Sequence, residues 1–210
     1  MKRSIYFFLH LKLLKEMQNE RILKIIFVGP ASSGKSLLVN ILSQQIDITK
    51  ISYRPTKAVR IVETDVKEIP KEVSILPKNI GIQLWDLGGD KHNQQYWNSA
   101  LYNADGVVLV YNADRPGQDR ELETIAYFFN QRPENAILKP VSDSRCFVIA
   151  NSQRQQDRYR NADKSLLPSS ISNKFKEIHF NDPRDDVERI QKEFQIFVNN
   201  IYTEISTGRK

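Results

Sequence analysis

The chain has 210 residues, of which 40% are hydrophobic and 10% aromatic, and this composition supports a packed core and excludes an intrinsically disordered chain. No apolar run exceeds five residues, so no segment is long enough to cross a membrane as a helix. A single cysteine cannot form an internal disulfide, and this favours an intracellular protein.

The net charge of +6 is concentrated near the N-terminus. Residues 1–24 carry six basic and two acidic side chains, whereas the remaining 186 residues carry 25 basic and 23 acidic ones. A nucleic-acid-binding protein gathers positive charge on a folded face, so we expect no nucleic-acid partner.

The first 16 residues have a basic start and an apolar middle. His10 and Lys12 interrupt the apolar stretch and no small-residue cleavage site follows, so a signal peptide is not favoured. The favoured interpretations are an accessory extension or a start codon set too early, with Met17 as the true start. An amphipathic membrane helix is the alternative. The C-terminus has no prenylation box and Lys2 follows Met1, so we expect no lipid anchor.

Strands and helices alternate along the rest of the chain. Apolar or alternating stretches predict strands over residues 22–28, 58–66, 80–85, 107–112, 146–150 and 176–180. The runs 107–112 and 146–150 are continuously apolar, as in strands buried on both faces of a parallel sheet.

Helices are predicted over residues 35–45 and 122–129, and a last one, with Asp182 as its N-cap, begins at Pro183 and continues to Ile201. Residues 152–173 are polar and could hold a short helix. The order of elements predicts a doubly wound α/β domain, with a mostly parallel central sheet flanked by helices.

A phosphate-binding motif separates the first strand from the first helix. It matches GxxxxGK(S/T), in which glycines let backbone N–H groups surround phosphate at a helix N-terminus. Lys35 is expected to reach the β- and γ-phosphates, and the Ser36 hydroxyl to bind Mg²⁺. The predicted nucleotide-binding loop is Gly29, Pro30, Ala31, Ser32, Ser33, Gly34, Lys35 and Ser36.

A second motif, Trp85-Asp86-Leu87-Gly88-Gly89, ends a predicted strand. Its Asp-x-x-Gly spacing is typical of a γ-phosphate sensor, in which Asp86 holds Mg²⁺ through water and the Gly89 N–H bonds phosphate. Thr56, which follows Pro55 between the two motifs, could close over Mg²⁺ and the γ-phosphate as a first switch; a simple turn before a strand is the alternative.

These residues resemble the Ras superfamily of small GTPases and, within it, the Rab-like subunit of intraflagellar transport complex B. The resemblance extends from about residue 21 to residue 201. It implies an N-terminal extension over 1–20, a P-loop NTPase domain of the small-GTPase type over 21–204 and a polar tail over 205–210. The narrower likeness rests on Asp47-Ile-Thr, Pro55-Thr56, Val59 to Glu63, Trp85 to Asp90 and Gly106 to Asp114.

Three departures from a working GTPase accompany the resemblance. Asp90 stands where a glutamine orders the attacking water, so catalysis at this degenerate position is in doubt. The guanine-reading stretch Asn-Lys-x-Asp corresponds to Asn151-Ser152-Gln153-Arg154, which keeps only the asparagine. The Ser-Ala-Lys that supports the base is also absent, and His179 stands near its place.

The resemblance implies GTP or GDP with Mg²⁺ as ligands, coiled-coil subunits of complex B as partners, no homo-oligomer, and a location in the cytoplasm and the cilium or flagellum. Three functions fit the residues: a nucleotide-binding docking subunit with slow or absent hydrolysis, a GTPase switch that cycles with a regulator, and a P-loop kinase or ATPase. The Asp-x-x-Gly and Pro-Thr motifs argue against the third.

Overall fold

The described strands form one six-stranded sheet at the centre of the domain. The structure is a computed structural model, and it describes residues 22–44, 54–65, 80–130, 138–152, 167–180 and 184–208. Within these ranges β2 pairs antiparallel with β3, and every other neighbouring pair of strands is parallel. The order across the sheet is β2 (Val59–Asp65), β3 (Gly81–Leu87), β1 (Ile22–Val28), β4 (Gly106–Asn112), β5 (Cys146–Asn151) and β6 (Lys176–Phe180).

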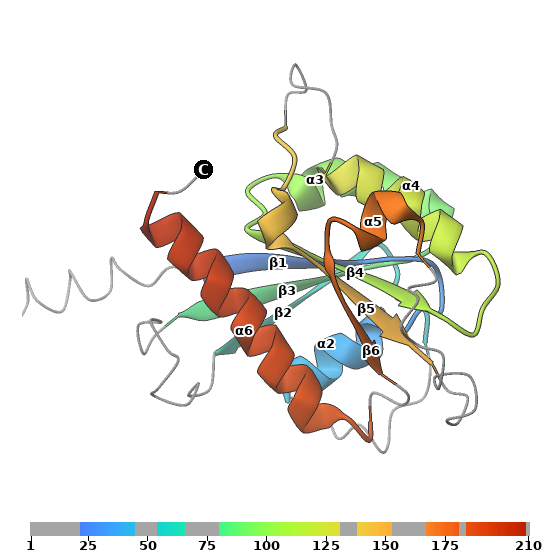
Figure 1. The fold of residues 1–210 in the computed structure, drawn as a ribbon, viewed down its shortest axis with the longest axis horizontal. Helices are drawn as coiled ribbons and strands as arrows, with labels where there is room; N and C mark the ends of the chain where they lie inside the picture. The colour runs from blue at the N-terminus through green and yellow to red at the C-terminus, as the bar shows by residue number, and fades with distance from the viewer. Residues whose placement is uncertain are drawn as a thin grey trace, which may run out of the picture.

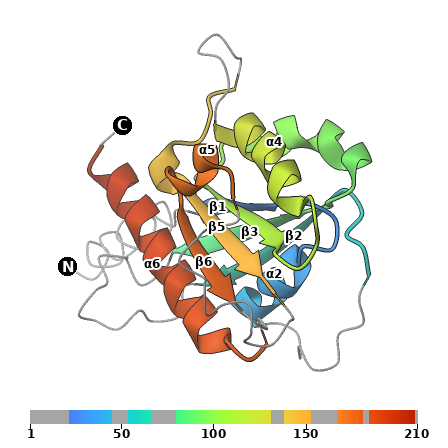
Figure 2. The ribbon, with the colours of Figure 1, turned by 45° about the vertical axis from the view of Figure 1, so that its right-hand side comes forward.

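Helices cover both faces of the sheet (Figures 1 and 2). On one face lie α2 (Lys35–Ser43) and α6 (Val187–Ser206), and on the other lie α3 (Trp97–Leu101), α4 (Gln118–Asn130) and α5 (Ser169–Ser172). Two short 3-10 helices, η2 (Lys91–Tyr96) and η3 (Asp143–Arg145), precede α3 and β5.

The central strands are buried because helices cover both of their faces. All residues of β4 except the last are buried, and successive side chains enter opposite layers: Val108 packs with α2 and α6, and Leu109 with α3 and α4. The apolar side chains of α6 recur every three or four residues, so one stripe of the helix faces the sheet. This framework brings the carboxyl ends of β1, β3, β4 and β5 to one edge.

The structure confirms the α/β class and the mostly parallel sheet. The predicted strands 22–28 and 176–180 have the observed bounds, and the others differ by one or two residues. The last helix begins at Val187, later than predicted, because residues 184–186 form a turn; Asp182 and Pro183 lie outside the described residues. The segment 97–101, for which no helix was predicted, forms α3.

In the part of the chain that the structure describes, no helix has both the length and the apolar character needed to span a bilayer.

Candidate nucleotide-binding site

The loop between β1 and α2 lies close against the neighbouring strands. A Cβ atom on Gly29 would stand 1.8 Å from the carbonyl oxygen of Val110 in β4, so only glycine fits there. Gly34 has a φ of +96°, and a Cβ there would stand 2.4 Å from Nδ2 of Asn151. The two glycines of the motif therefore allow a tight loop that ends at the N-terminus of a helix.

The Lys35 ammonium lies inside this loop and is only 5% exposed. It donates hydrogen bonds to the carbonyl oxygens of Gly29 (2.8 Å) and Pro30 (2.6 Å) and to Ser33 Oγ (3.1 Å). Burial lowers the pKa of Lys35 to about 8, while the charges of Asp86 and Glu121 act in the opposite direction. An anion placed in the loop would favour the protonated lysine.

Oxygen atoms from three separate segments meet beside Lys35. Ser36 Oγ, in the first turn of α2, and Thr56 Oγ1, before β2, lie 2.7 Å apart and share a hydrogen bond. Thr56 Oγ1 also donates to Asp86 Oδ2, in β3, at 3.2 Å. Two hydroxyls and a carboxylate are hard oxygen donors of the kind that Mg²⁺ prefers.

Asp86 provides the test of whether a cation fits here. Its side chain is fully buried, and within the described residues its Oδ1 atom accepts no hydrogen bond. A buried carboxylate oxygen without a donor is costly, and a cation-bound water could satisfy it. The residues present therefore suit a Mg²⁺ ion, with Asp86 acting through water.

Arg60 in β2 is a site residue to which the sequence analysis gave no role. Its Nε and Nη2 atoms lie 3.2 and 3.1 Å from Asp86 Oδ2, and Nη1 donates to Asn40 Oδ1 at 2.8 Å. Nη2 also donates to the Ser36 carbonyl oxygen at 3.3 Å. In the sequence, Arg60 stands out only as a charged residue within a predicted strand. The pairing of β2 with β3 shows that it faces the carboxylate of Asp86.

Gly89 lies directly on the phosphate-binding loop. A Cβ on this residue would stand 2.6 Å from the Ala31 nitrogen and from the Pro30 carbonyl oxygen. The preceding residue, Gly88, donates its N–H to the Ala58 carbonyl oxygen at 2.8 Å, which ties this segment to the one that follows Thr56. The three predicted motifs are thus adjacent in space.

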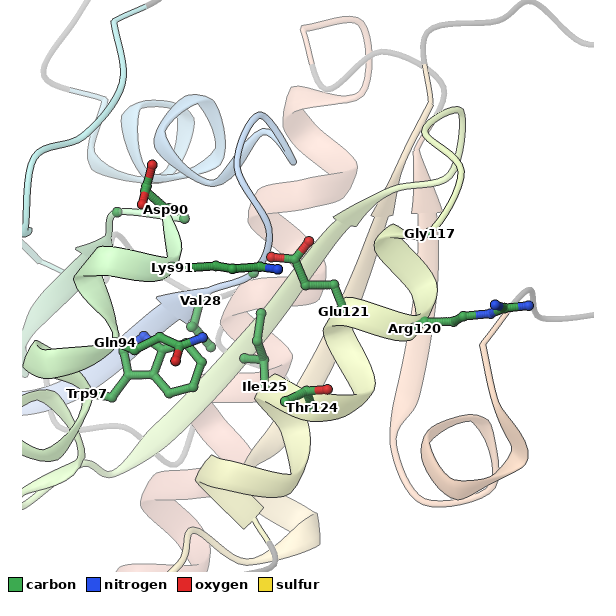
Figure 3. A pocket seen from close by; sticks show the side chains of 13 residues that line it. Val28, Asp90, Lys91, Gln94, Trp97, Gly117, Arg120, Glu121, Thr124 and Ile125 are labelled. Atoms are coloured by element: carbon green, nitrogen blue, oxygen red, sulfur yellow. The ribbon is translucent and has the colours of Figure 1, made fainter.

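Asp90 is engaged as the N-cap of η2. Its Oδ1 atom accepts from the His92 backbone N–H at 2.9 Å and lies 2.7 Å from His92 Nδ1. The hydrogen bond from the His92 backbone N–H is the main cause that holds the pKa of Asp90 below its ordinary value, and the hydrogen bond with the His92 side chain adds to it. Figure 3 shows this carboxylate turned away from Lys91 and Glu121. The side chain at the glutamine position therefore stabilises a helix end.

Asn151 supports the loop from β5. Its Nδ2 donates to the Ser33 carbonyl oxygen at 2.6 Å, and its Oδ1, buried, accepts no hydrogen bond from the described residues. Ser152, at the lysine position of the guanine-reading motif, donates from Oγ to both carboxylate oxygens of Asp114 at 3.0 Å. Gln153 and Arg154 lie outside the described residues.

Gln118 is a second residue that sequence reasoning missed. Its Nε2 donates to the Ala31 carbonyl oxygen at 2.9 Å, while its Oε1 accepts from the Asn112 N–H at 2.8 Å. This buried side chain joins the start of α4 to the phosphate-binding loop and to the end of β4. A glutamine at the start of a helix does not by itself indicate a site residue. The partners of Gln118 are backbone atoms, and one of them, in Ala31, is distant in the sequence.

Known proteins resemble this chain over most of its length. A family model described as Ras of Complex, Roc, domain of DAPkinase matches residues 24–153. The Homo sapiens protein named intraflagellar transport protein 22 homolog is 35% identical over 188 residues, which are 89% of this chain and 93% of that protein. The Chlamydomonas reinhardtii intraflagellar transport protein 22 is 36% identical over 132 residues, 62% of either chain.

Two Trypanosoma brucei crystal structures share the fold. One is described as GTP-bound IFT22/74/81; it covers 83% of this chain and 95% of the matched chain, with a TM-score of 0.58 and 23% identity. The other is described as GTP-bound IFT22; it covers 89% and 99% of the two chains, with a TM-score of 0.58 and 21% identity.

Proposed function

The chain belongs to the intraflagellar transport protein 22 family and carries a Ras-like Roc domain, and from this premise we propose that it is a GTP-binding, Rab-like subunit of intraflagellar transport complex B. One observation carries the proposal: Ser36, Thr56 and Asp86, from three separate segments, meet beside the buried ammonium of Lys35.

In this proposal the loop from Gly29 to Ser36 surrounds the phosphates of GTP or GDP with backbone N–H groups. Lys35 leaves its carbonyl acceptors to bond phosphate oxygens, an exchange of neutral acceptors for charged ones. Gly89, which already touches the loop, offers its N–H to a terminal phosphate. Asn151 keeps the loop in place through Ser33 and has a second polar atom for the base.

The residues proposed to hold Mg²⁺ are Ser36, Thr56 and, through water, Asp86. The cation would neutralise phosphate charge when bound. Arg60 keeps Asp86 aligned by engaging the oxygen that also accepts from Thr56, so the other oxygen stays available.

Hydrolysis is proposed to be slow or absent. A glutamine that orders water is replaced by Asp90, and that carboxylate is bonded to His92 at the start of η2. The second candidate is a GTPase switch that cycles with a regulator supplying the missing group in trans. The contact of Gly89 with the phosphate-binding loop favours it, because a terminal phosphate there would move the following segment.

Coiled-coil subunits of complex B are the proposed partners, and the cytoplasm and the cilium or flagellum the proposed location. The family name supports a role in intraflagellar transport. The Trypanosoma brucei protein described as part of a GTP-bound IFT22/74/81 structure supports docking on other subunits of the complex.

Calorimetric titration with GTP, GDP and ATP, each with and without EDTA, tests the nucleotide assignment. We expect both guanine nucleotides to bind, ATP to bind more weakly, and EDTA to weaken binding of GTP. Asn151 alone remains of the guanine-reading motif. The preference for GTP over ATP should therefore stay below about 10⁵-fold, which is the discrimination reached by sites that form hydrogen bonds with the groups distinguishing two substrates. Equal binding of ATP would favour a kinase or ATPase, and binding of no nucleotide would contradict the proposal.

A further inference from the structure

A cavity of about 510 Å³ lies between η2 and α4 and is open to the phosphate-binding loop. Val28, Trp97 and Ile125 form its apolar floor (Figure 3). Gly29 of the phosphate-binding loop and Gly89 also line it. The charged residues that line the cavity are Asp90, Lys91, Arg120 and Glu121, and Figure 3 shows the side chains of Asp90 and Arg120 pointing away from the other two. The two side chains of interest are Lys91 and Glu121.

Lys91 and Glu121 point toward each other across the cavity (Figure 3). Lys91 is the first residue of η2, two positions after the glycine that touches Pro30 and Ala31. Glu121 lies in the first turn of α4. Both charged groups therefore lie at the rim of the site proposed for the terminal phosphate.

Glu121 also places negative charge beside the phosphate-binding loop, because it lines the same cavity as Gly29 and Gly89. A carboxylate in that position repels phosphate groups bound in the loop. Diphosphate and triphosphate differ by one charged group, so this repulsion falls more strongly on the triphosphate.

We propose that Lys91 and Glu121 together set the preference of this site between nucleoside triphosphate and diphosphate. Lys91 attracts the terminal phosphate, and Glu121 offsets that attraction by placing negative charge near the Lys91 side chain and beside the loop. The inference rests on the proposed nucleotide-binding function and adds to it the two residues that balance the phosphate charge.

The test measures the affinities of a non-hydrolysable GTP analogue and of GDP, both with Mg²⁺, for the full chain and its variants. Glu121→Gln should raise the ratio of triphosphate to diphosphate affinity about three- to tenfold, and Lys91→Gln should lower it by a similar factor, as expected for a unit charge several ångströms away in a partly solvated site. The double variant should return to within about twofold of wild type.

Matched controls separate this role from helix stabilisation. Asp119 is the other acidic residue in the first turn of α4, and it does not line the cavity, so Asp119→Asn should leave the ratio unchanged. Lys139→Gln removes an exposed positive charge before β5 and should also leave it unchanged.

The outcomes distinguish this inference from the function on which it rests. Ratios that stay within twofold of wild type in both single variants, or that move in the same direction, would overturn the role of the pair while leaving nucleotide binding intact. A wild-type chain that binds neither nucleotide would instead contradict the proposed function.

Discussion

Lys35 is held by three acceptors inside the phosphate-binding loop, and its replacement should remove a charged contact to phosphate. Lys35→Ala is expected to weaken nucleotide binding by about 2–3 kcal/mol, the range for hydrogen bonds to charged groups. Calorimetry with GTP measures the loss, and Lys139→Ala is the control for an exposed lysine. Unchanged affinity in Lys35→Ala would remove this lysine from the site.

The lowered pKa of Lys35 also predicts a pH dependence of binding. A phosphate partner raises this pKa above its value of about 8 in the nucleotide-free chain, so affinity is full below pH 8 and is lost as the pH rises through 8 toward the higher pKa of the bound state. We expect the dissociation constant of GTP to rise by up to about tenfold per pH unit above 8. Lys35→Arg, which does not titrate in this range, should remove the dependence, and an equal slope in both proteins would exclude Lys35 as its origin.

The same pKa has the opposite consequence for the stability of the nucleotide-free chain. A lysine whose folded pKa is about 8 binds fewer protons when folded than when unfolded, where its value is 10.5. The contribution of Lys35 to the free energy of unfolding therefore rises between pH 8 and pH 10.5. The bound nucleotide stabilises the charged form, so binding and folding respond to pH in opposite directions.

Arg60 is expected to matter through Asp86 and not through direct contact with nucleotide. Arg60→Met leaves the buried carboxylate without its cationic partner and should lower the free energy of unfolding by about 1–3 kcal/mol, a value kept small because the arginine is 34% exposed. Urea denaturation measures this loss. In an Asp86→Asn background the same substitution should cost less, and additive losses would contradict the coupling.

At the scale of elements, η2 explains why the glutamine position departs from the pattern of active GTPases. Asp90 caps this helix, and its carboxylate is bonded to His92 and turned away from Lys91 and Glu121. Without a water-ordering group, the single-turnover rate of GTP hydrolysis should be at or below about 10⁻⁴ to 10⁻³ s⁻¹, as in unassisted small GTPases. A rate near 1 s⁻¹ in the purified chain would show that another residue orders the water.

The elements also show what sequence patterns can predict. The strands of the sheet were predictable because each has a continuous apolar run or an alternation of apolar and polar residues, and the continuously apolar strands β4 and β5 are indeed buried. The short helix α3 was not, because its burial rests on Trp97, which contacts Phe128 and Phe129 of α4 on the same face of the sheet. Such contacts join segments that are distant in the sequence, so they produce no periodic pattern of apolar residues within the helix itself.

The candidate site divides in the same way. The motifs that contain Lys35, Thr56 and Asp86 are fixed by local spacing and were visible in the sequence. Arg60 and Gln118 were not, since their partners are atoms brought close only by strand pairing and by the packing of α4. The cavity between η2 and α4 likewise has no signature in the sequence.

At the scale of the whole molecule, the proposed slow hydrolysis suits a subunit that remains docked in a complex better than it suits a GTPase switch that must change state repeatedly. Bound nucleotide would then stabilise the domain by mass action and order the segments around Thr56 and Gly89. We expect the nucleotide-free, diphosphate-loaded and triphosphate-loaded forms to bind the coiled-coil partners with affinities that differ by less than tenfold. Pull-downs with the three forms measure this, and a larger difference between the loaded forms would support the switch.

The most direct test of the central claim is to identify the nucleotide that remains bound to the protein after purification in Mg²⁺. Chromatography of the acid-released ligand should give GTP or GDP in near-stoichiometric amount, and Lys35→Ala should retain far less. Release of adenine nucleotide alone, or wild-type protein that neither carries nor takes up any nucleotide, would contradict the assignment of this chain as a GTP-binding subunit.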